Sequence, residues 1–226
     1  MRVPPDMTVP TFSTRSQLGR PVGARGEQTR QRIITAAMRC VAEAGPAQAS
    51  IREIAKAADM TSGSLYHYFP NKSELLNATA TEIEEIVLPR LHAAAASSDD
   101  IVDRLDAVLD ESKRLMRDYP YLAGFLRAVR AENADQTGGG RRTYPGSKAL
   151  RDVITEIVDD ARGRGVLSAG IAPGAAVDAI CALTRGLTEQ AANLGPQSYD
   201  VTLDSAKQLL RGSLFAGAKP TATHRT

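Results

Sequence analysis

The chain has 226 residues, of which 42% are hydrophobic, so it can bury the core of one globular domain or two small ones. Tryptophan is absent and only 4% of the residues are aromatic, so we expect packed helices rather than strands. No stretch approaches the roughly 20 apolar residues of a membrane span, so we expect a cytoplasmic protein without a membrane partner. The net charge of +2 divides unevenly, because residues 1–80 hold 10 Lys and Arg against 6 Asp and Glu, and residues 81–226 hold 18 against 20.

Residues 1–26 combine prolines, glycines and arginines without a sustained apolar period, which predicts a disordered basic arm. The arm is either an inert tail or a segment that contacts phosphates or a minor groove of DNA. A first amphipathic helix is expected from Glu27 to the break at Gly45-Pro46. Its apolar face has the i, i+3, i+4, i+7 spacing of Ile34, Ala37, Met38 and Val41.

Two short helices are expected next. Ser50 and Glu53 form a capping box at the start of the first, which ends around Asp59. Thr61 caps the second, which ends before Pro70. Two short capped helices joined by a tight turn are what a helix-turn-helix requires, and its second helix enters the major groove of DNA. Helical spacing turns Leu65 and Phe69 inward, against Ile34, Val41, Ile54 and Ala58.

The rest of the chain has helical periodicity. A second capping box, from Asn71 to Glu74, opens a long helix that reaches Pro89, which should kink or end it. Further helices are expected around residues 101–116, 122–129, 147–161, 173–194 and 203–214, with a loop at 135–146. The expected domains are a disordered basic N-terminal arm (1–26), a helix-turn-helix domain (27–73), a helical domain (74–217) and a disordered tail (218–226).

The segment from Thr61 to Leu75, TSGSLYHYFPNKSEL, carries a family resemblance. With Ile54-Ala55 and the break at Gly45, it resembles the tetracycline-repressor (TetR) family of transcriptional regulators over residues 28–76. The resemblance implies an all-α fold, with an N-terminal three-helix helix-turn-helix DNA-binding domain and a C-terminal helical ligand-binding and dimerisation domain. It also implies a repressor that a small-molecule ligand releases from a palindromic double-stranded DNA operator. Ser62 departs from the family, where a basic or larger residue is frequent at this position.

The resemblance assigns DNA contacts position by position. Phosphate contacts are expected from Tyr68 and Lys72, and the positive end of the helix dipole at Lys72 also favours a phosphate. Ser50 and Thr61 can donate hydroxyls to phosphates as well as cap their helices. The groove-contacting positions are Arg52, Ser62, Gly63, Ser64, Tyr66 and His67. The alternatives are partial packing of the two tyrosines on the first helix and a solvated Lys72.

The C-terminal helices give two further sets of candidates. The resemblance implies a homodimer in which the last two helices pair, with an intramolecular core stripe as the alternative; the expected interface is Ile180, Leu183, Leu187, Leu194, Leu210 and Leu214. Aromatic or isolated polar groups on apolar helices suggest a ligand pocket, with ordinary core packing as the alternative. Those candidates are Met116, Tyr119, Tyr121, Phe125, Leu126, Val129, Thr184 and Asn193.

No motif indicates an enzyme, a metal or a cofactor. The three histidines, His67, His92 and His224, are too dispersed to form a cluster, and Cys40 and Cys181 lack metal-ligand spacing. The glycine run at 138–140 lacks the Lys-Ser/Thr of a nucleotide loop. The alternative to a DNA-binding regulator is a helical interaction protein without specific DNA binding. A steep salt dependence of DNA affinity would separate the two.

Overall fold

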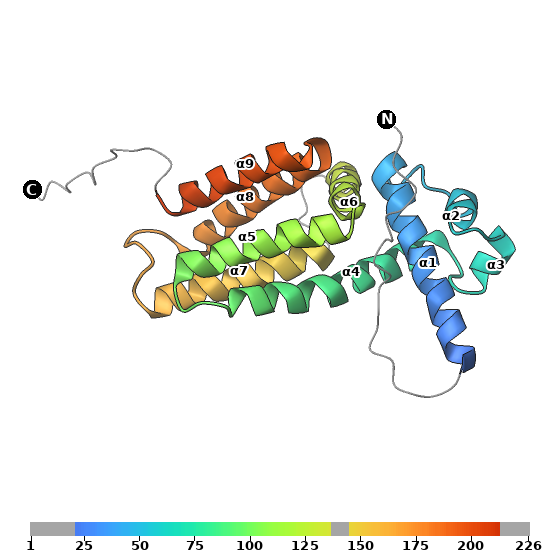
Figure 1. Cartoon of the computed structure of the whole chain (residues 1–226), viewed down its shortest axis with the longest axis horizontal. Coiled ribbons are helices and arrows are strands. Elements are labelled where there is room, and N and C mark those ends of the chain that lie inside the picture. The colour runs from blue at the N-terminus through green and yellow to red at the C-terminus, as the bar shows by residue number, and fades with distance from the viewer. Residues whose placement is uncertain (1–20, 137–144, 213–226) are drawn as a thin grey trace, which may run out of the picture.

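The computed structural model describes residues 21–136 and 145–212, and all regular secondary structure within them is α-helical, as predicted. A small N-terminal domain lies beside a larger helical bundle (Figure 1). The helices are α1 (Pro21–Ala44), α2 (Ile51–Ala57), α3 (Ser62–Tyr66), α4 (Lys72–Ala95), α5 (Ile101–Asp118), α6 (Leu122–Gln136), α7 (Pro145–Gly163), α8 (Pro173–Asn193) and α9 (Pro196–Leu210).

The N-terminal domain is built around the inner face of α1. Helix α2 packs on α1, and α3 packs on α2. Leu65 and Phe69 are buried in this core, on the inward face that the sequence predicted. The side chains that fill it, each exposed by 4% or less, are Ile33, Ile34, Ala37, Val41, Ile54, Ala58, Leu65 and Phe69. Because this core fixes α3 by its inner face, the other face of α3 is held toward solvent.

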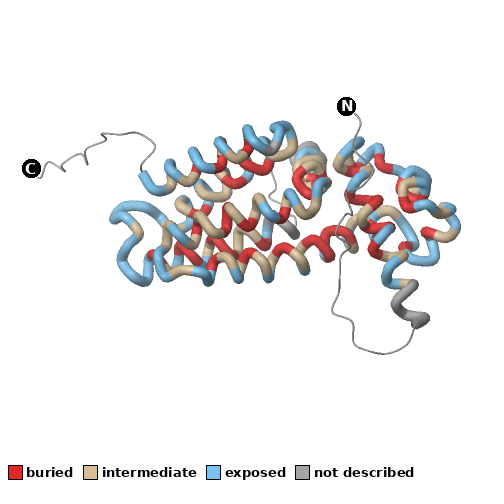
Figure 2. The backbone as a smooth tube through the Cα atoms, viewed as in Figure 1, coloured by how far each residue is buried: buried red, intermediate tan, exposed pale blue. Residues whose placement is uncertain are grey.

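The C-terminal bundle is layered. Helix α4 packs against α5 and α7, α7 packs against α8, and α8 packs against α9, which forms the upper edge in Figure 1. Buried side chains line the inner faces of these helices, while the outer faces of α8 and α9 stay exposed (Figure 2). The bundle therefore has one long exposed flank formed by its last two helices.

Helices α4 and α6 join the two domains. Helix α4 runs from the helix-turn-helix into the bundle, and α6 packs on α1 at one end and on α8 at the other. At the α1–α6 contact, a Cβ placed on Gly124 would lie 3.0 Å from the Cβ of Ala42. This contact therefore needs glycine, because a larger side chain would push α6 away from α1.

Helix boundaries differ from the predictions at several places. Helix α1 begins at Pro21, so residues 21–26 are helical and the prediction of a disordered arm up to residue 26 is wrong there. Proline suits a first helical turn, where its missing N–H has no acceptor to lose. Helix α7 likewise begins at Pro145, inside the expected loop. Residues 1–20 of the arm and the tail beyond residue 212 lie outside the described residues.

Pro89 lies inside α4 and does not end it, so the prediction of a helix end there is wrong. Proline removes one backbone hydrogen bond, at a cost of about 3 kcal/mol within a helix. The contacts of the following turn offset this cost. Leu91 is 1% exposed in the core, and Arg90 forms ion pairs with Glu111 and Asp118 of α5. Tertiary packing thus outweighs the local preference of proline.

Candidate nucleic-acid interface and ligand cavity

A capping box holds the start of α2. The Ser50 hydroxyl accepts from the Glu53 backbone N–H at 3.2 Å, and the Glu53 carboxylate accepts from the Ser50 backbone N–H at 2.9 Å. These bonds lower the pKa of Glu53, the Ser50 backbone N–H having the largest effect and the Ser50 hydroxyl the next. The exposed carboxylate is therefore kept charged at the helix start, where the helix dipole also favours it.

The turn between α2 and α3 depends on Asp59. Its φ of 52° lies in the left-handed region, which aspartate tolerates better than most residues. The Met60 N–H then donates to the Ala55 carbonyl at 3.0 Å, which closes the turn. Thr61 caps α3 as predicted, its hydroxyl accepting from the Ser64 backbone N–H at 3.1 Å. Two short helices thus meet at a fixed angle.

Helix α3 presents polar and aromatic groups to solvent. Tyr66 is 51% exposed and Tyr68 is 38% exposed, and His67 is also exposed. A Cβ on Gly63 would meet only the Thr61 hydroxyl oxygen, at 3.9 Å, so the fold does not require glycine at this exposed position. Exposed aromatic groups on a short helix that is fixed from behind are suited to contact an external partner, such as the base edges and phosphates of a DNA groove.

The other candidate DNA contacts lie on α2, on α3 itself and at the start of α4. Arg52 is exposed on α2, and Ser62 and Ser64 are half-buried in α3. Lys72, half-buried at the start of α4, donates from its Nζ to the Ala47 carbonyl oxygen at 3.1 Å. Lys72 thus ties α4 to the segment after α1, a contact that the sequence did not predict, while two of its three ammonium protons remain for another acceptor. The helices that carry these residues lie together at one end of the molecule (Figure 1).

A buried polar cluster connects the helix-turn-helix to α4. The carboxylate of Glu82, a residue only 6% exposed, accepts from Gln31 Nε2 at 2.9 Å and pairs with Arg30 at 3.4 Å. The Arg30 guanidinium also lies over the ring of Phe69, 5.5 Å from its centroid. Phe69 lies three residues after the end of α3, so this cluster links α4 to the segment that follows α3.

A cavity lies in the C-terminal bundle between α4, α5, α6, α7, α8 and α9. Its empty space is about 540 Å³, including the part of its mouth that is open to solvent. The lining residues are Val87, Leu91, Leu109, Ser112, Leu115, Met116, Leu122, Leu126, Leu150, Thr184, Leu187, Thr188 and Tyr199. The wall is therefore mainly aliphatic, with hydroxyl groups as its polar atoms. Burial, and to a lesser extent Asp200, raises the pKa of Tyr199 to about 12.

Three of the eight sequence-predicted ligand residues lie on this wall, namely Met116, Leu126 and Thr184. The others lie elsewhere, for separate reasons. Phe125 and Val129 are buried in the main core, and Tyr119 and Tyr121 pack against that core. Asn193 is exposed and accepts from Arg127 at 3.1 Å. The aliphatic residues of α4 and α5 that line the cavity could not be told from ordinary core residues in the sequence.

The residues predicted at the dimer interface fall into two groups. Leu187 is 5% exposed and packs with Leu109, Tyr199 and Leu203 of its own chain, and Leu183 and Leu210 pack against the same cluster. Ile180 packs inward as well. For these four the intramolecular stripe is the better account, because each packs against buried residues of its own chain. Leu194 is 37% exposed, and Leu214 lies outside the described residues.

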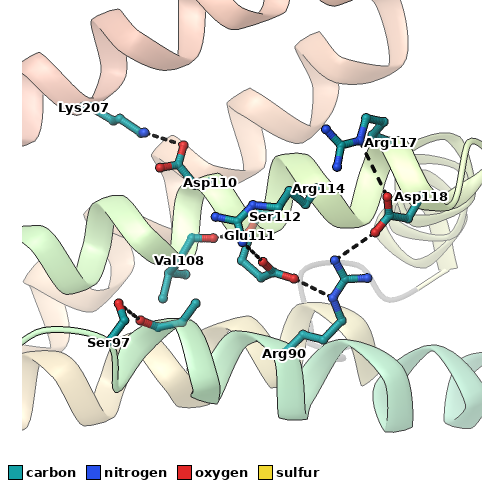
Figure 3. Close-up of polar contacts among 11 residues, drawn as sticks. Arg90, Ser97, Val108, Asp110, Glu111, Ser112, Arg114, Arg117, Asp118 and Lys207 are labelled. Atoms are coloured by element: carbon teal, nitrogen blue, oxygen red, sulfur yellow. Dashed lines mark hydrogen bonds and ion pairs between the residues drawn. The ribbon is translucent and has the colours of Figure 1, made fainter.

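An ion-pair cluster joins α4 to α5 close to this cavity. Figure 3 shows Arg90 between two carboxylates, with its Nε 2.5 Å from Glu111 and its Nη2 2.9 Å from Asp118. Glu111 also accepts from Arg114. Because Leu91 and Leu115 line the cavity and Arg90 and Glu111 belong to the same helices, a shift of α5 would be transmitted to α4.

Comparison with known proteins gives a family match for the N-terminal domain. The model of "Bacterial regulatory proteins, tetR family" matches residues 33–79. HTH-type transcriptional regulator BetI of Escherichia coli (strain UMN026) is 35% identical over 85 residues, 36% of this chain and 43% of BetI. BetI of Stenotrophomonas maltophilia is 37% identical over 82 residues, 36% of this chain and 42% of that protein. The match therefore spans less than half the length of these relatives.

Solved structures match over both domains. FadR from Bacillus subtilis, in complex with stearoyl-CoA, has a TM-score of 0.67 and 21% identity, and the match covers 81% of this chain and 98% of FadR. FadR from Bacillus halodurans has a TM-score of 0.65 and 18% identity, covering 85% and 97%. Salmonella enterica GusR has a TM-score of 0.58 and 26% identity, covering 82% and 95%. The order of the helices is thus shared along almost the full length of each.

Proposed function

Because the chain belongs to the tetR family of bacterial regulatory proteins, we propose that it binds a specific DNA operator as a homodimer and represses transcription until a small molecule occupies its cavity. The observation that carries this proposal is the geometry of α3. Leu65 and Phe69 fix its inner face, and Tyr66 and Tyr68 stand exposed on the other. A regulator of this kind acts in the cytoplasm, where the DNA is.

DNA contact is assigned to α2, α3 and the start of α4. Helix α3 enters the major groove, where Ser64 and Tyr66 contact base edges, while Tyr68 and Lys72 bind phosphates. Arg52, Ser62, Gly63 and His67 flank this contact, with Ser50 and Thr61 offering hydroxyls at its border. Helix α3 has only five residues, so a single domain would make few base contacts. A second copy doubles them at half-sites about 34–36 Å apart.

The exposed flank of α8 and α9 supports dimerisation. Val201 is 68% exposed, Leu209 51% and Leu194 37%, and exposed apolar groups on adjacent helices are typical of an interface. Ala182 and Gly186 on α8 are exposed and small, so the helices of a second copy can approach closely. This surface replaces the inward-facing Leu183, Leu187 and Leu210 as the proposed interface, and it keeps Leu194.

Release by a ligand is assigned to α4, which contacts both sites. Val87 and Leu91 of α4 line the cavity, and Glu82 of the same helix binds Arg30 and Gln31 of α1. A ligand that moves this part of α4 changes the separation of the two DNA-binding domains in the dimer. The coupling free energy required is about 1–3 kcal/mol. Operator DNA must lower the affinity for the ligand by the same factor as the ligand lowers the affinity for operator DNA.

Selection from a random duplex library tests the proposal. The purified full-length chain should enrich one inverted repeat and bind it as two copies per site. A helical interaction protein would enrich no sequence, and that outcome would refute the proposed function. Ser64→Ala and Tyr66→Ala should reduce the enrichment, while Arg162→Gln, on the exposed end of α7, should leave it unchanged.

A further inference from the structure

The cavity wall contains no charged side chain among the described residues. Three of its four hydroxyl groups are already engaged as donors, since Ser112 donates to the Val108 carbonyl, Thr184 to the Cys181 carbonyl and Thr188 to the Thr184 carbonyl. The fourth hydroxyl, of Tyr199, is neutral. The wall can therefore accept an apolar body but offers little to balance a charge. Any charged part of a ligand must be bound at the rim.

Arginines gather at the α6–α8 side of this rim. Arg130 of α6 has an Nη2 atom that is buried and has no hydrogen-bond partner in the described part of the chain. It interacts electrostatically with Arg185 and Glu189 of α8. Arg127, one turn earlier on α6, pairs with the same Glu189 at 3.9 Å. Arg127 and Arg130 thus share one carboxylate, and Arg185 adds a further positive charge near Arg130, which leaves an excess of positive charge among these described side chains.

Helical geometry places this group beside the cavity. Arg130 follows Leu126 by four residues, so the two lie on the same face of α6, about one turn apart. Arg185 and Glu189 come one residue after the lining residues Thr184 and Thr188 and are exposed, so on α8 they lie to the side of the wall and not on it. The two helices pack against each other, so the arginines stand at the end of the wall that Leu126 and Thr188 form.

Burial of Arg130 without full pairing is costly to the empty protein. A buried donor without an acceptor costs about 1–3 kcal/mol, and more when it is charged. Burial lowers the pKa of Arg130, and the neighbouring Arg185 lowers it further, against an opposing effect of Glu189. Glu189 is exposed and pairs with Arg127, and the Nη2 atom of Arg130 has no hydrogen-bond partner among the described residues. An oxyanion at this point would supply the missing acceptor.

We propose, on the basis of the function proposed above, that the ligand is an amphiphilic anion whose apolar body fills the cavity and whose oxyanion head binds Arg130, with Arg127 and Arg185 around it. The head is a carboxylate or a phosphate, because both present the paired oxygens that a guanidinium binds through two hydrogen bonds. The aliphatic wall favours an alkyl or similarly apolar group as the other half of the ligand.

Calorimetric titration of the full-length chain without DNA tests this ligand class. The probes are decanoate, decyl phosphate and decanol, which share an apolar tail and differ in the head, each used below its micelle concentration. At least one anion should bind about tenfold or more tightly than decanol, as expected for a charged hydrogen-bonded pair in a partly buried site. The tighter anion identifies the head. Equal affinities, or no binding of either anion, would overturn the proposal.

Single substitutions locate the head. Arg130→Gln should reduce the affinity of the preferred anion to that of decanol and leave decanol binding unchanged. Its melting temperature should not fall, because the substitution removes a buried charge that lacks a full set of partners. Arg185→Gln alters an exposed residue and should also lower the affinity for the anion. This second variant keeps the test valid if Arg130→Gln does not fold. Arg162→Gln on α7 removes the same charge away from the cavity and should change neither affinity.

Retention of the full anion preference by both Arg130→Gln and Arg185→Gln would refute the assignment of the head. Operator affinity is measured on the same wild-type sample. If the wild-type chain binds its operator but binds neither anion more tightly than decanol, only the proposed ligand class is refuted. If the wild-type chain binds an anion preferentially but binds no operator, the proposed regulatory function is refuted and the proposed ligand site is not.

Discussion

Gly63 of α3 is a glycine that the fold does not require. Glycine in a helix is less stable than alanine by about 1 kcal/mol, and the structure leaves open space around this position. The helix is therefore less stable than it would be with alanine at this position, although an alanine side chain would fit. We propose that the α3 backbone approaches the DNA closely at this position, which would explain why no side chain is present.

Gly63→Ala should raise the free energy of unfolding by up to about 1 kcal/mol and weaken operator binding. Urea denaturation and fluorescence anisotropy with operator DNA measure the two effects. Gly163→Ala at the exposed end of α7, where a Cβ meets nothing within 4 Å, is the matched control and should leave operator affinity unchanged. If Gly63→Ala kept full operator affinity, close backbone approach would be excluded.

At this scale the sequence predicted capping residues and inward-facing residues well. Ser50, Thr61 and Asn71 cap their helices through side-chain oxygens as predicted, because a cap depends on neighbours three residues away. The bond from Lys72 to the Ala47 carbonyl was not predicted. It joins residues that are distant in the chain and follows from how α4 sits on α1, which local spacing does not determine.

Among the elements, α2 depends on its capping box. The pKa of Glu53 is lowered from its ordinary 4.5, so the folded state binds this proton less tightly than the unfolded state does. The stability that the charged group contributes is then present above pH 4.5 and lost as the pH falls through the lowered value.

Glu53→Gln should therefore be less stable than the wild type at neutral pH and equal to it once the pH is below the lowered pKa of Glu53. Urea denaturation of both proteins across this pH range gives the difference in free energy of unfolding. A difference that stays constant with pH would show that the charge of Glu53 does not stabilise α2.

Helix α4 depends on Glu82 for its attachment to the N-terminal domain. Glu82→Gln keeps the size of the side chain and an acceptor for Gln31, but it removes the charge that pairs with Arg30. The free energy of unfolding should fall by about 1–3 kcal/mol, the usual value for a hydrogen bond to a charged group. Glu85→Gln, at an exposed position of the same helix, should stay within about 0.5 kcal/mol of the wild type. Equal effects of the two substitutions would contradict a linking role for Glu82.

Helices as elements were predictable from periodicity, but their ends were predictable only where a cap marks them. Pro89 was expected to end or kink a helix that continues to Ala95. The contacts that hold the next turn, between Arg90 and the carboxylates of α5, come from a part of the chain that follows later in the sequence. The start of α1 at Pro21 was missed because the segment has no apolar period.

For the whole molecule, the proposed interface between copies is the least predictable feature. The stripe with Leu183 and Leu187 resembles a pairing face in the sequence, yet α9 of the same chain covers it. Apolar spacing shows that a face is buried but not whether its partner is in the same chain or in another. The exposed Val201 and Leu209 stand out only once the packing of α8 on α9 is known.

Val201→Glu combined with Leu209→Glu should give folded monomers that bind operator weakly, because a charge cannot be buried unpaired in an apolar interface. Sedimentation velocity measures the oligomeric state and circular dichroism the helix content. Leu187→Glu is the contrasting variant. At 5% exposure inside the chain, it should lose stability and helix content instead. An intact dimer in the Val201→Glu, Leu209→Glu variant would exclude this flank as the interface.

The affinity of the full-length chain for its selected operator, compared with a scrambled duplex of equal length over a range of salt concentrations, tests the central claim most directly. A specific regulator should bind the operator about 10³-fold or more tightly than the scrambled duplex, and the logarithm of both affinities should fall linearly with the logarithm of the salt concentration. Equal affinities for the two duplexes would contradict the claim that α3 recognises a DNA sequence.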